Sequence, residues 1–312
     1  MKNNTHIATP KISISVCTRK RPKMLSRLLD SMASMAYPEG VDVSIDIFEN
    51  NTAKSLTGLI EKISKDIPVS VNHHLEKKYG IPIVRNTALK VAKNADASHI
   101  IFIDDDERVD QFWLVNLWDY YLQCEDNTVV QGAVISTIET TKNCHLHSHF
   151  QRPMRSTGDI LETCATNNVL IKLSVFVDHN LKFDETRPLA GGTDSKLFHK
   201  ARKCGIPLHY CAEAIVYEDV PEERVSLRWL GKRNFRIGLT VGKRKKSEGE
   251  GLEYPLSHTL KTFRLLARSL PHPIRRKRKK QHERWLLAWR CAGKVLGYFN
   301  VTIDYYKKID GE

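Results

Sequence analysis

The stretch Ile100-Ile101-Phe102-Ile103-Asp104-Asp105-Asp106-Glu107 places four apolar residues directly before four acids. A short apolar run of this kind is typical of a strand buried in a parallel sheet. The acids would then stand at the carboxyl end of the strand, the edge at which open α/β sheets bind ligands. Like charges packed together repel one another unless a cation neutralises them. A hard divalent metal that also holds phosphate oxygens would do so, and an acidic turn after a strand is the alternative.

Strand and helix patterns alternate through the residues that precede this stretch. In chain order, we expect strands at 11–18, 41–48 and 69–72 and helices at 24–35, 56–63 and 83–95. With the strand at residue 100, this alternation predicts a parallel sheet covered by helices. The later elements are a helix at 112–122, a strand at 129–135, core residues at 169–177, a helix at 194–204 and a strand at 208–217. The polar, His-rich segment 141–158 is expected to form a loop over the site.

The positive charge of the chain is concentrated in its last part. The formal net charge of the 312 residues is +13, and residues 224–312 alone carry 23 basic and 7 acidic side chains, a net of +16. The first 223 residues carry 26 basic and 29 acidic side chains, a net of −3. From Pro221 onward the sequence predicts Arg/Lys-rich helices, with a loop at 243–251. We therefore divide the chain into a first domain, 1–222, and a basic helical region, 223–312.

Cysteine usage and the N-terminus indicate the compartment. The seven cysteines are scattered, odd in number and include no Cys-x-x-Cys pair, which favours a reducing compartment over a disulfide framework or a zinc site. Residues 1–9 lack the apolar core of a signal peptide. No run of about 18 uncharged apolar residues occurs. We expect a cytoplasmic protein that at most rests on the inner face of the cell membrane.

Six short motifs follow one another along the first domain. They are Thr18-Arg19-Lys20-Arg21-Pro22, Ile47-Phe48-Glu49-Asn50-Asn51, Gly80-Ile81-Pro82-Ile83-Val84-Arg85-Asn86, Phe102-Ile103-Asp104-Asp105-Asp106, Thr166-Asn167-Asn168-Val169-Leu170-Ile171 and Gly191-Gly192-Thr193-Asp194. Each motif is common by itself, but all six in this order are not expected by chance. In this order they resemble the bacterial family 2 glycosyltransferases, over about residues 12–238.

The resemblance implies a GT-A fold, a Rossmann-like, mostly parallel sheet flanked by helices. It places the nucleotide-sugar half at about 11–135 and the acceptor half at about 136–222, followed by the basic helical extension. It also implies a metal-dependent, inverting enzyme of the hexosyltransferase type.

The same resemblance implies donor-binding roles for seven residues, namely Thr18, Arg21, Glu49, Arg85, Asp104, Asp105 and Arg233. Glu49 stands where the family usually has an Asp that contacts the nucleotide base. Arg85 would face the uridine or a phosphate, and a solvated helix residue is the alternative. Arg233 lies on an Arg-rich helix that closes over the diphosphate in relatives, where a guanidinium suits phosphate oxygens. A solvated helix face is the alternative for Arg233.

The metal ligands are assigned to the acids at the strand end. Acids two residues apart can direct their carboxylates to the same side. We assign Asp106 to the metal and Asp104 to the metal or the ribose, while Asp105 could replace either. The metal would be Mg²⁺ or Mn²⁺, acting as a Lewis acid on the diphosphate. Glu218 stands where many relatives have a metal-binding His, so it is either a ligand or a plain surface acid.

The acceptor side is assigned from the last two motifs and comprises Asn167, Gly191, Gly192 and Thr193. Thr193 replaces the Glu of the Glu-Asp pair that is common in the family. Asp194, which is retained, would take the proton of the acceptor hydroxyl as general base. An N-cap is the structural alternative for Asp194, and the two roles can coexist.

The basic region ends in an amphipathic pattern. Six consecutive cations, 275–280, precede one helical face made of Trp285, Trp289, Ala292, Val295, Leu296 and Phe299. This pattern is typical of an interfacial helix on an anionic membrane. Alternatively, the face packs on the catalytic domain or on a second subunit.

These patterns predict an enzyme that moves a sugar from a nucleotide-diphospho-sugar, most simply a UDP-sugar, to a saccharide or lipid-linked acceptor in bacterial polysaccharide or glycolipid assembly. A nucleic-acid-binding protein driven by the basic tail is the main alternative, but it leaves Asp104, Asp194 and Arg85 unexplained, so we expect no nucleic acid. A non-catalytic sugar-nucleotide binder with the same fold is the second alternative.

Overall fold

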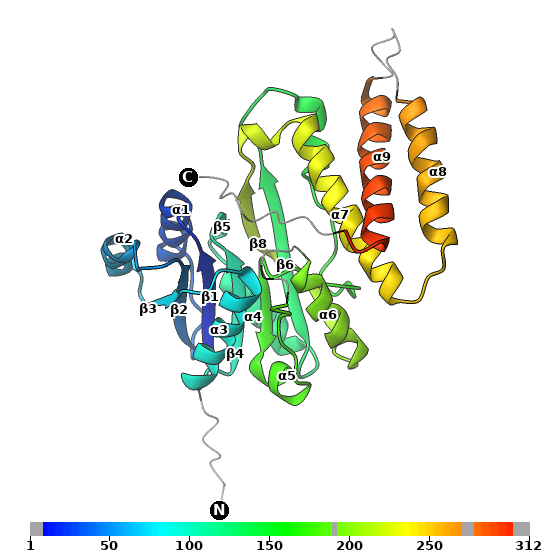
Figure 1. The fold of residues 1–312 in the computed structure, drawn as a ribbon. Helices are drawn as coiled ribbons and strands as arrows, with labels where there is room; N and C mark the ends of the chain where they lie inside the picture. The colour runs from blue at the N-terminus through cyan, green and yellow to red at the C-terminus, as the bar shows by residue number, and fades with distance from the viewer. Residues whose placement is uncertain (1–8, 187, 189–191, 270–277, 302–312) are drawn as a thin grey trace, which may run out of the picture.

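The computed structural model describes residues 9–186, 188, 192–269 and 278–301. Its centre is an eight-stranded sheet in the order β3-β2-β1-β4-β7-β6-β8-β5 (Figure 1). β1, β2, β3 and β4 are parallel, as are β6 and β8, whereas β7 and β5 run antiparallel to their neighbours. The Rossmann-like sheet predicted from the sequence is thus confirmed for the first half, and the second half makes the sheet mixed.

The first half of the chain forms the elements that its hydrophobic periodicity predicts. Their bounds are β1 Lys11–Thr18, α1 Pro22–Ala33, β2 Asp42–Asn50, α2 Thr57–Ile63, β3 Ser70–Glu76, α3 Ile81–Asn94 and β4 His99–Asp104. A short 3₁₀ segment, Ser64–Asp66, follows α2. Pro22 and Pro82 stand in the first turns of α1 and α3, where the missing N–H of proline costs nothing.

The second half contains a strand at 107–109 that the sequence pattern did not predict, and the segment expected only as core, 169–177, divides into a strand and a helix. Its bounds are β5 Glu107–Val109, α4 Trp113–Gln123, β6 Val129–Thr137, β7 Val169–Lys172, α5 Leu173–Asp178, α6 Thr193–Lys203 and β8 Leu208–Asp219. The 3₁₀ segments Cys144–His149 and Glu222–Arg224 lie in the connections. β5 was missed because three residues carry no readable period.

Alternate residues of the central strand pack into separate cores on the two faces of the sheet. Ile101 and Ile103 of β4 belong to the core that packs under α1 and α4. Ile100 and Phe102 belong to the core that includes α3, α5 and α6. The uninterrupted apolar run of β4 is therefore explained by a strand buried on both faces, as the sequence predicts.

Three helices form the basic region, α7 Leu227–Ser247, α8 Glu253–Ala267 and α9 Arg278–Tyr298, with α9 lying between the other two (Figure 1). The loop predicted at 243–251 is wrong in part, because α7 continues through Lys243 to Ser247. α7 and α9 approach closely through glycines: a Cβ atom on Gly238 would collide with the Arg290 carbonyl, and one on Gly297 with the Leu239 carbonyl. The contact is thus as tight as backbones allow.

Candidate active site

A cavity of about 420 Å³ opens at the carboxyl ends of β1 and β4, and it is also lined by residues of α3, α6 and α7. Most of the residues predicted for the site line this cavity. They are Thr18, Arg21, Arg85, Asp104, Asp105, Asp106, Asn167, Gly192, Thr193, Asp194, Glu218 and Arg233. Glu49 does not line it, and Gly191 lies outside the described residues. Residues up to 215 positions apart in the sequence therefore share one cavity.

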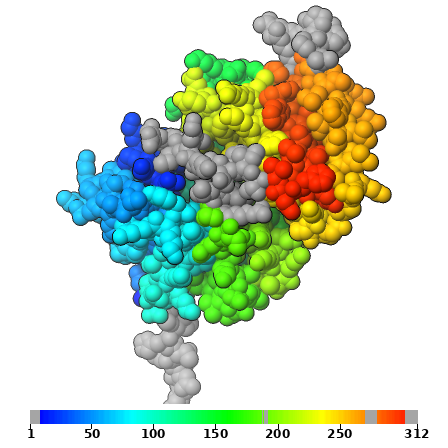
Figure 2. Space-filling view, in the orientation of Figure 1, coloured from blue at the N-terminus to red at the C-terminus, as the bar shows by residue number. Residues whose placement is uncertain are grey.

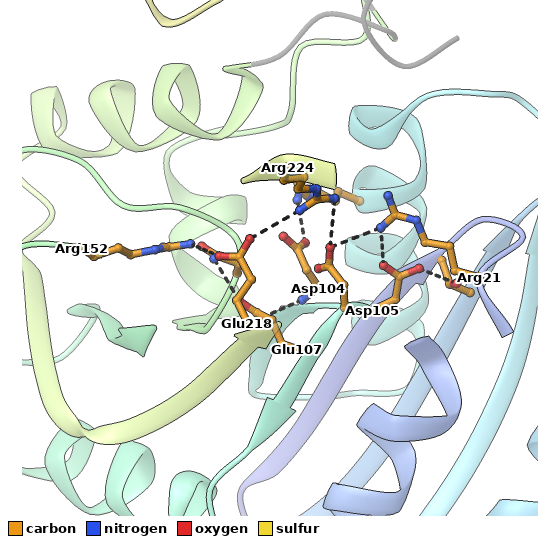
Figure 3. A network of polar contacts seen from close by, with 11 residues as sticks. Arg21, Asp104, Asp105, Glu107, Arg152, Glu218 and Arg224 are labelled. Atoms are coloured by element: carbon orange, nitrogen blue, oxygen red, sulfur yellow. Dashed lines mark hydrogen bonds and ion pairs between the residues drawn. The ribbon is translucent and has the colours of Figure 1, made fainter. Parts of the chain in front are cut away.

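The three consecutive aspartates have different surroundings (Figure 3). Asp105 is 3% exposed and accepts hydrogen bonds from the Thr18 hydroxyl at 2.7 Å and from the Arg21 guanidinium at 2.9 Å. Asp104, the last residue of β4, meets Arg85 of α3 at 3.4 Å. Asp106 lies 3.5 Å from Arg21. Asp105 is thus tied to the β1–α1 turn, while Asp104 and Asp106 are held only by longer ion pairs.

Crowding of these acids raises their pKa values. Removal from bulk water raises the pKa of Asp104 to about 6, and repulsion from Asp106, Asp105 and Asp194 adds to the rise while Arg85 opposes it. Burial likewise raises the pKa of Asp105 to about 6, against the lowering effect of Arg21. A site in which several carboxylates resist ionisation has excess negative potential. Such a site favours a bound cation, which would return these groups to their charged form.

Glu107 is a buried acid beside the cavity to which the sequence analysis gave no role. It is 1% exposed, accepts a hydrogen bond from the Asp104 backbone N–H at 3.1 Å, and accepts another from the Asn167 amide at 3.0 Å. Burial together with the charges of Asp104 and Asp106 holds its pKa well above the ordinary value. Asn167, predicted for the acceptor side, therefore also fixes the turn that carries the aspartates. The sequence signal that could have identified Glu107 was its place as the fourth acid in the run 104–107.

Arginines lie around the acids, with Arg152 beside Glu218, Arg224 above Asp104 and Arg21 beside Asp105 (Figure 3). Arg224 lies 4.0 Å from Asp106 and 3.8 Å from Glu218, so one guanidinium bridges the end of β4 and the end of β8. Arg152 meets Glu218 at 3.2 Å. Sequence reasoning noted Arg224 within the basic run but chose Arg233, and it gave Arg152 no role because that residue lies in a polar loop without a pattern.

The residues fit a hard divalent cation only if other oxygens complete its coordination. No group of three or more His, Cys, Asp or Glu side chains within the described residues is arranged to hold a metal. The carboxylates of Asp106 and Glu218 nevertheless converge on one cation, the Arg224 guanidinium. Mg²⁺ is usually bound by one or two carboxylates together with substrate phosphates and water. A pair of carboxylates of this kind matches that donor set.

Asp194 enters the cavity from the first turn of α6. Gly192 precedes the helix with φ +86°, a conformation that L side chains rarely adopt. Gly192 is the N-cap, so the N-cap role considered for Asp194 is wrong in position, although its carboxylate accepts the Ser195 backbone N–H at 2.8 Å. The charge of Asp194 contributes to the raised pKa of Asp104, and both residues line the same cavity. The residue is half-buried.

Glu49 lies apart from the cavity at the end of β2. It is fully buried, and it accepts hydrogen bonds from the Ser55 and Leu56 backbone N–H groups and from the His73 ring at 3.0 Å. These bonds hold the entry to α2 and lower its pKa against the effect of burial. The neighbouring residue, Asn50, lines the cavity instead. Successive strand residues point to opposite faces, so Asn50 and not Glu49 lines the cavity. The donor-binding role of Glu49 stays a prediction.

Arg233 lies on the α7 wall among aromatic rings. Its guanidinium stands 5.7 Å from the Trp229 ring and 5.9 Å from the Phe150 ring, and it donates to the His149 carbonyl at 3.4 Å. Burial lowers its pKa. Phe150 belongs to the segment that was expected to form a loop over the site, and it lines the cavity. The aromatic residues were missed, although Trp229 stands four residues before Arg233.

The sequence and the fold were compared with known proteins. The model of glycosyl transferase family 2 matches residues 13–179. A curated relative, the succinoglycan biosynthesis protein ExoM of Rhizobium meliloti (strain 1021), is 30% identical over 244 residues, 77% of each chain.

Solved glycosyltransferase structures have a similar fold. S. aureus TarS residues 1–349 give a TM-score of 0.54 at 14% identity, covering 97% of this chain and 95% of that one. GalNAc-T7, solved with UDP, GalNAc and Mn²⁺, gives 0.53 at 15% identity, covering 78% of this chain and 52% of that one. At these identities the structures bear on the fold alone, which agrees with the GT-A prediction. The family match and the relative confirm the resemblance read from the six motifs: the chain is a glycosyltransferase and belongs to glycosyl transferase family 2.

Proposed function

We propose that the chain transfers a sugar from a nucleotide-diphospho-sugar to a hydroxyl of a saccharide or lipid-linked acceptor, with inversion at the anomeric carbon. The observation that carries the proposal is the shared cavity of Asp194 and the strand-end acids Asp104 and Asp106. Asp194 would take the proton of the acceptor hydroxyl, and Asp104 and Asp106 would serve the side of the leaving diphosphate. A UDP-sugar is the preferred donor, because the TarS structure was solved with UDP-GlcNAc and GalNAc-T7 with UDP.

The acids of β4 and β8 would hold Mg²⁺ or Mn²⁺ through Asp106 and Glu218, with Asp104 directed to the metal or the ribose. When bound, the metal supplies Lewis acidity that stabilises the negative charge on the leaving diphosphate. Asp105 supports this role by anchoring the turn to Thr18 and Arg21. Metal use is consistent with GalNAc-T7, whose structure contains Mn²⁺.

The arginines would bind the diphosphate from the α7 side. Arg233 has no carboxylate partner among the ion pairs of the described residues, and the aromatic faces of Trp229 and Phe150 hold its guanidinium in place. Arg224, which lies near Asp106 and Glu218, would also bind phosphate oxygens of the donor. A planar guanidinium fits two phosphate oxygens at once.

Asp194 would act as general base. The acceptor oxygen attacks the anomeric carbon from the face opposite the diphosphate, and the bond from that carbon to the diphosphate oxygen breaks as the new glycosidic bond forms. The acceptor proton passes to the Asp194 carboxylate. One displacement inverts the configuration of the anomeric carbon. Gly192 and Thr193 place the carboxylate at the helix start, and Asn167 stands beside them on the cavity wall.

The pathway and the location are part of the same proposal. ExoM is described as a succinoglycan biosynthesis protein, which supports a role in bacterial polysaccharide assembly. We place the reaction in the cytoplasm, on the inner face of the cell membrane, with the basic region 223–312 as the contact and 1–222 as the catalytic domain. Among the described residues, no helix is long and apolar enough to cross a bilayer.

The test is a panel of nucleotide sugars screened by thermal shift, with Mn²⁺ and with EDTA. A ligand that binds the folded state raises the melting temperature by mass action. We expect one UDP-sugar to stabilise the protein with Mn²⁺ and to lose most of that effect in EDTA. The nucleotide sugar that stabilises the protein most is then incubated with the protein and oligosaccharide acceptors. NMR of the product determines the anomeric configuration. Retention of configuration, or no stabilisation by any nucleotide sugar, contradicts the proposal.

A further inference from the structure

α8 carries a continuous apolar stripe on its outer surface. Five large side chains, four within the helix and one at its N-cap, are exposed: Leu252 by 70%, Leu256 by 63%, Leu260 by 52%, Phe263 by 67% and Leu266 by 40%. Their spacing of three and four residues places them on one helical face. The stripe spans about 20 Å at 1.5 Å per residue. Single exposed apolar residues need no explanation, but a stripe of this length on one helix does.

The stripe points away from the rest of the molecule. The other side of α8 packs on α9, where Pro255 is buried and His258 lies 3.2 Å from the Lys294 ammonium. Tyr254 stacks against Tyr298 of α9 at 6.0 Å. Figures 1 and 2 show α8 (orange) along the outer edge of the helical region. Packing on α9 therefore accounts for one face of α8 and leaves the stripe uncovered within the described structure.

Basic residues run beside the stripe. Lys261, Arg264 and Arg268 are exposed on one flank, and Glu253 is the only acid in α8. An amphipathic helix with Leu and Phe on one face and Lys and Arg beside them is the pattern of helices that lie in the membrane interface. Anionic headgroups would meet these cations. A second copy of the same surface would instead bring like charges together around the stripe, which disfavours a symmetric dimer there.

The face that the sequence suggested for membrane contact is partly used inside the protein. Trp285 of α9 packs over Gly231 of α7, and Trp289 meets the Phe235 ring at 5.7 Å. Leu286, next to Trp285, is buried. These contacts match the alternative considered for this face, packing on the protein itself. Of the six cations 275–280, the first three lie outside the described residues.

We propose that α8 is the membrane-binding element, lying parallel to the surface of an anionic leaflet with Leu256, Leu260 and Phe263 among the upper acyl chains. This inference develops the membrane contact of the proposed function and moves it from α9 to α8. It does not depend on the chemistry of the cavity.

The test is co-sedimentation of the full chain with vesicles. Vesicles of phosphatidylcholine with about 30% phosphatidylglycerol are compared with pure phosphatidylcholine. The stripe variant is Leu256→Ser/Leu260→Ser/Phe263→Ser, and its matched control, Phe112→Ser/Leu122→Ser/Val177→Ser, removes three side chains of similar exposure elsewhere. A charge variant is Lys261→Gln/Arg264→Gln/Arg268→Gln. UDP binding and light scattering are measured for each protein.

We expect wild type and the matched control to bind the anionic vesicles equally. Each serine of the stripe variant should weaken partitioning about tenfold, since each removes a large apolar group from the interface. The charge variant should lose about fivefold per cation at low salt and less at high salt. Equal binding by wild type and the stripe variant overturns the proposal, as does a dimer that only the stripe variant dissociates. Retained UDP binding in every variant keeps this outcome separate from the proposed function.

Discussion

Three adjacent aspartates illustrate how neighbours, and not residue type, set the chemistry of the site. Asp105 is fixed by two short hydrogen bonds from Thr18 and Arg21, residues 87 and 84 positions earlier. Asp104 keeps a longer ion pair at 3.4 Å, and Asp106 keeps two, at 3.5 Å and 4.0 Å. The sequence could not separate the three roles, because Thr18 and Arg21 come next to Asp105 only when β1 pairs with β4. The geometry favours Asp104 and Asp106 as the pair that meets a ligand.

Replacing Asp106 by Ala tests the metal assignment. We expect transfer to be lost, and Mn²⁺ should no longer strengthen UDP binding. Removal of one charge also relieves repulsion on Asp104 and Glu107, so the free energy of unfolding should stay level or rise. Calorimetric titration of UDP with and without Mn²⁺ gives the readout, with urea unfolding as the check on folding. Wild-type transfer that is equally fast in EDTA and in Mn²⁺ would refute the metal role.

The variant Asp194→Asn tests the general-base role on the acceptor side separately from the metal role. The amide keeps the size of the carboxylate and can still accept the Ser195 N–H, but it cannot take a proton. We expect UDP-sugar binding within a few-fold of wild type and a loss of kcat on the order of 10²–10⁴. Asp178→Asn, at the exposed end of α5, serves as the matched control. Normal turnover in Asp194→Asn would mean that another residue is the base.

At the scale of elements, the sequence predicted the strands and helices whose apolar residues repeat at a regular spacing. It missed those that form only through tertiary contacts. β1, β4 and α3 were found within two residues, because their apolar residues repeat at strand or helix spacing. β5 was missed because it exists only through its pairing with β8. α8 was not singled out, since an exposed stripe and a core-facing stripe have the same period. Most residues that the motifs singled out line the cavity, while the contacts of Glu107 and Arg152 could be seen only in the fold.

The glycines of α7 give a prediction about helix packing. Gly238→Ala places a methyl group against the Arg290 carbonyl of α9, so the two helices must separate. We expect a loss of about 1–3 kcal/mol in the free energy of unfolding, as is typical of overpacking. Gly58→Ala in α2 is the matched control, because a Cβ there meets open space, and it should add about 0.5–1 kcal/mol through helix propensity. Urea unfolding measures the free energy of unfolding of both variants. Equal values would contradict the tight contact between α7 and α9.

At the scale of the whole molecule, opposite charges come from the two ends of the chain. The near-neutral first 223 residues supply the acids at the sheet edge, and the basic region supplies Arg224, Arg233 and Arg236 on the opposite wall. The cavity therefore spans the boundary drawn at residue 222, and α7, which lies beyond that boundary, completes its wall. Because of this distribution, the basicity of the chain does not by itself indicate nucleic-acid binding. Some of the basic side chains line the cavity, and others lie beside the α8 stripe.

The pH dependence of global stability depends on a buried histidine remote from the cavity. His99, at the start of β4, is 6% exposed and meets the stacked rings of Trp118, at 5.0 Å, and Tyr121, at 4.7 Å, edge to face. Burial, aided by repulsion from Lys172, lowers its pKa from 6.5 to about 4. The unfolded chain therefore binds more protons than the folded chain between pH 6.5 and 4. Stability contributed by neutral His99 is complete above pH 6.5 and is lost as the pH falls toward 4.

We expect this single group to remove about 3 kcal/mol from the free energy of unfolding between pH 7.5 and pH 4. The variant His99→Gln keeps a polar side chain that cannot take up a proton. It should be less stable than wild type at pH 7.5, and the gap should shrink steadily as the pH falls. Urea unfolding at half-unit pH steps measures the two curves, and their difference isolates His99 because every other titrating group is shared. Parallel curves would show that His99 is protonated as readily in the folded protein as in the unfolded chain.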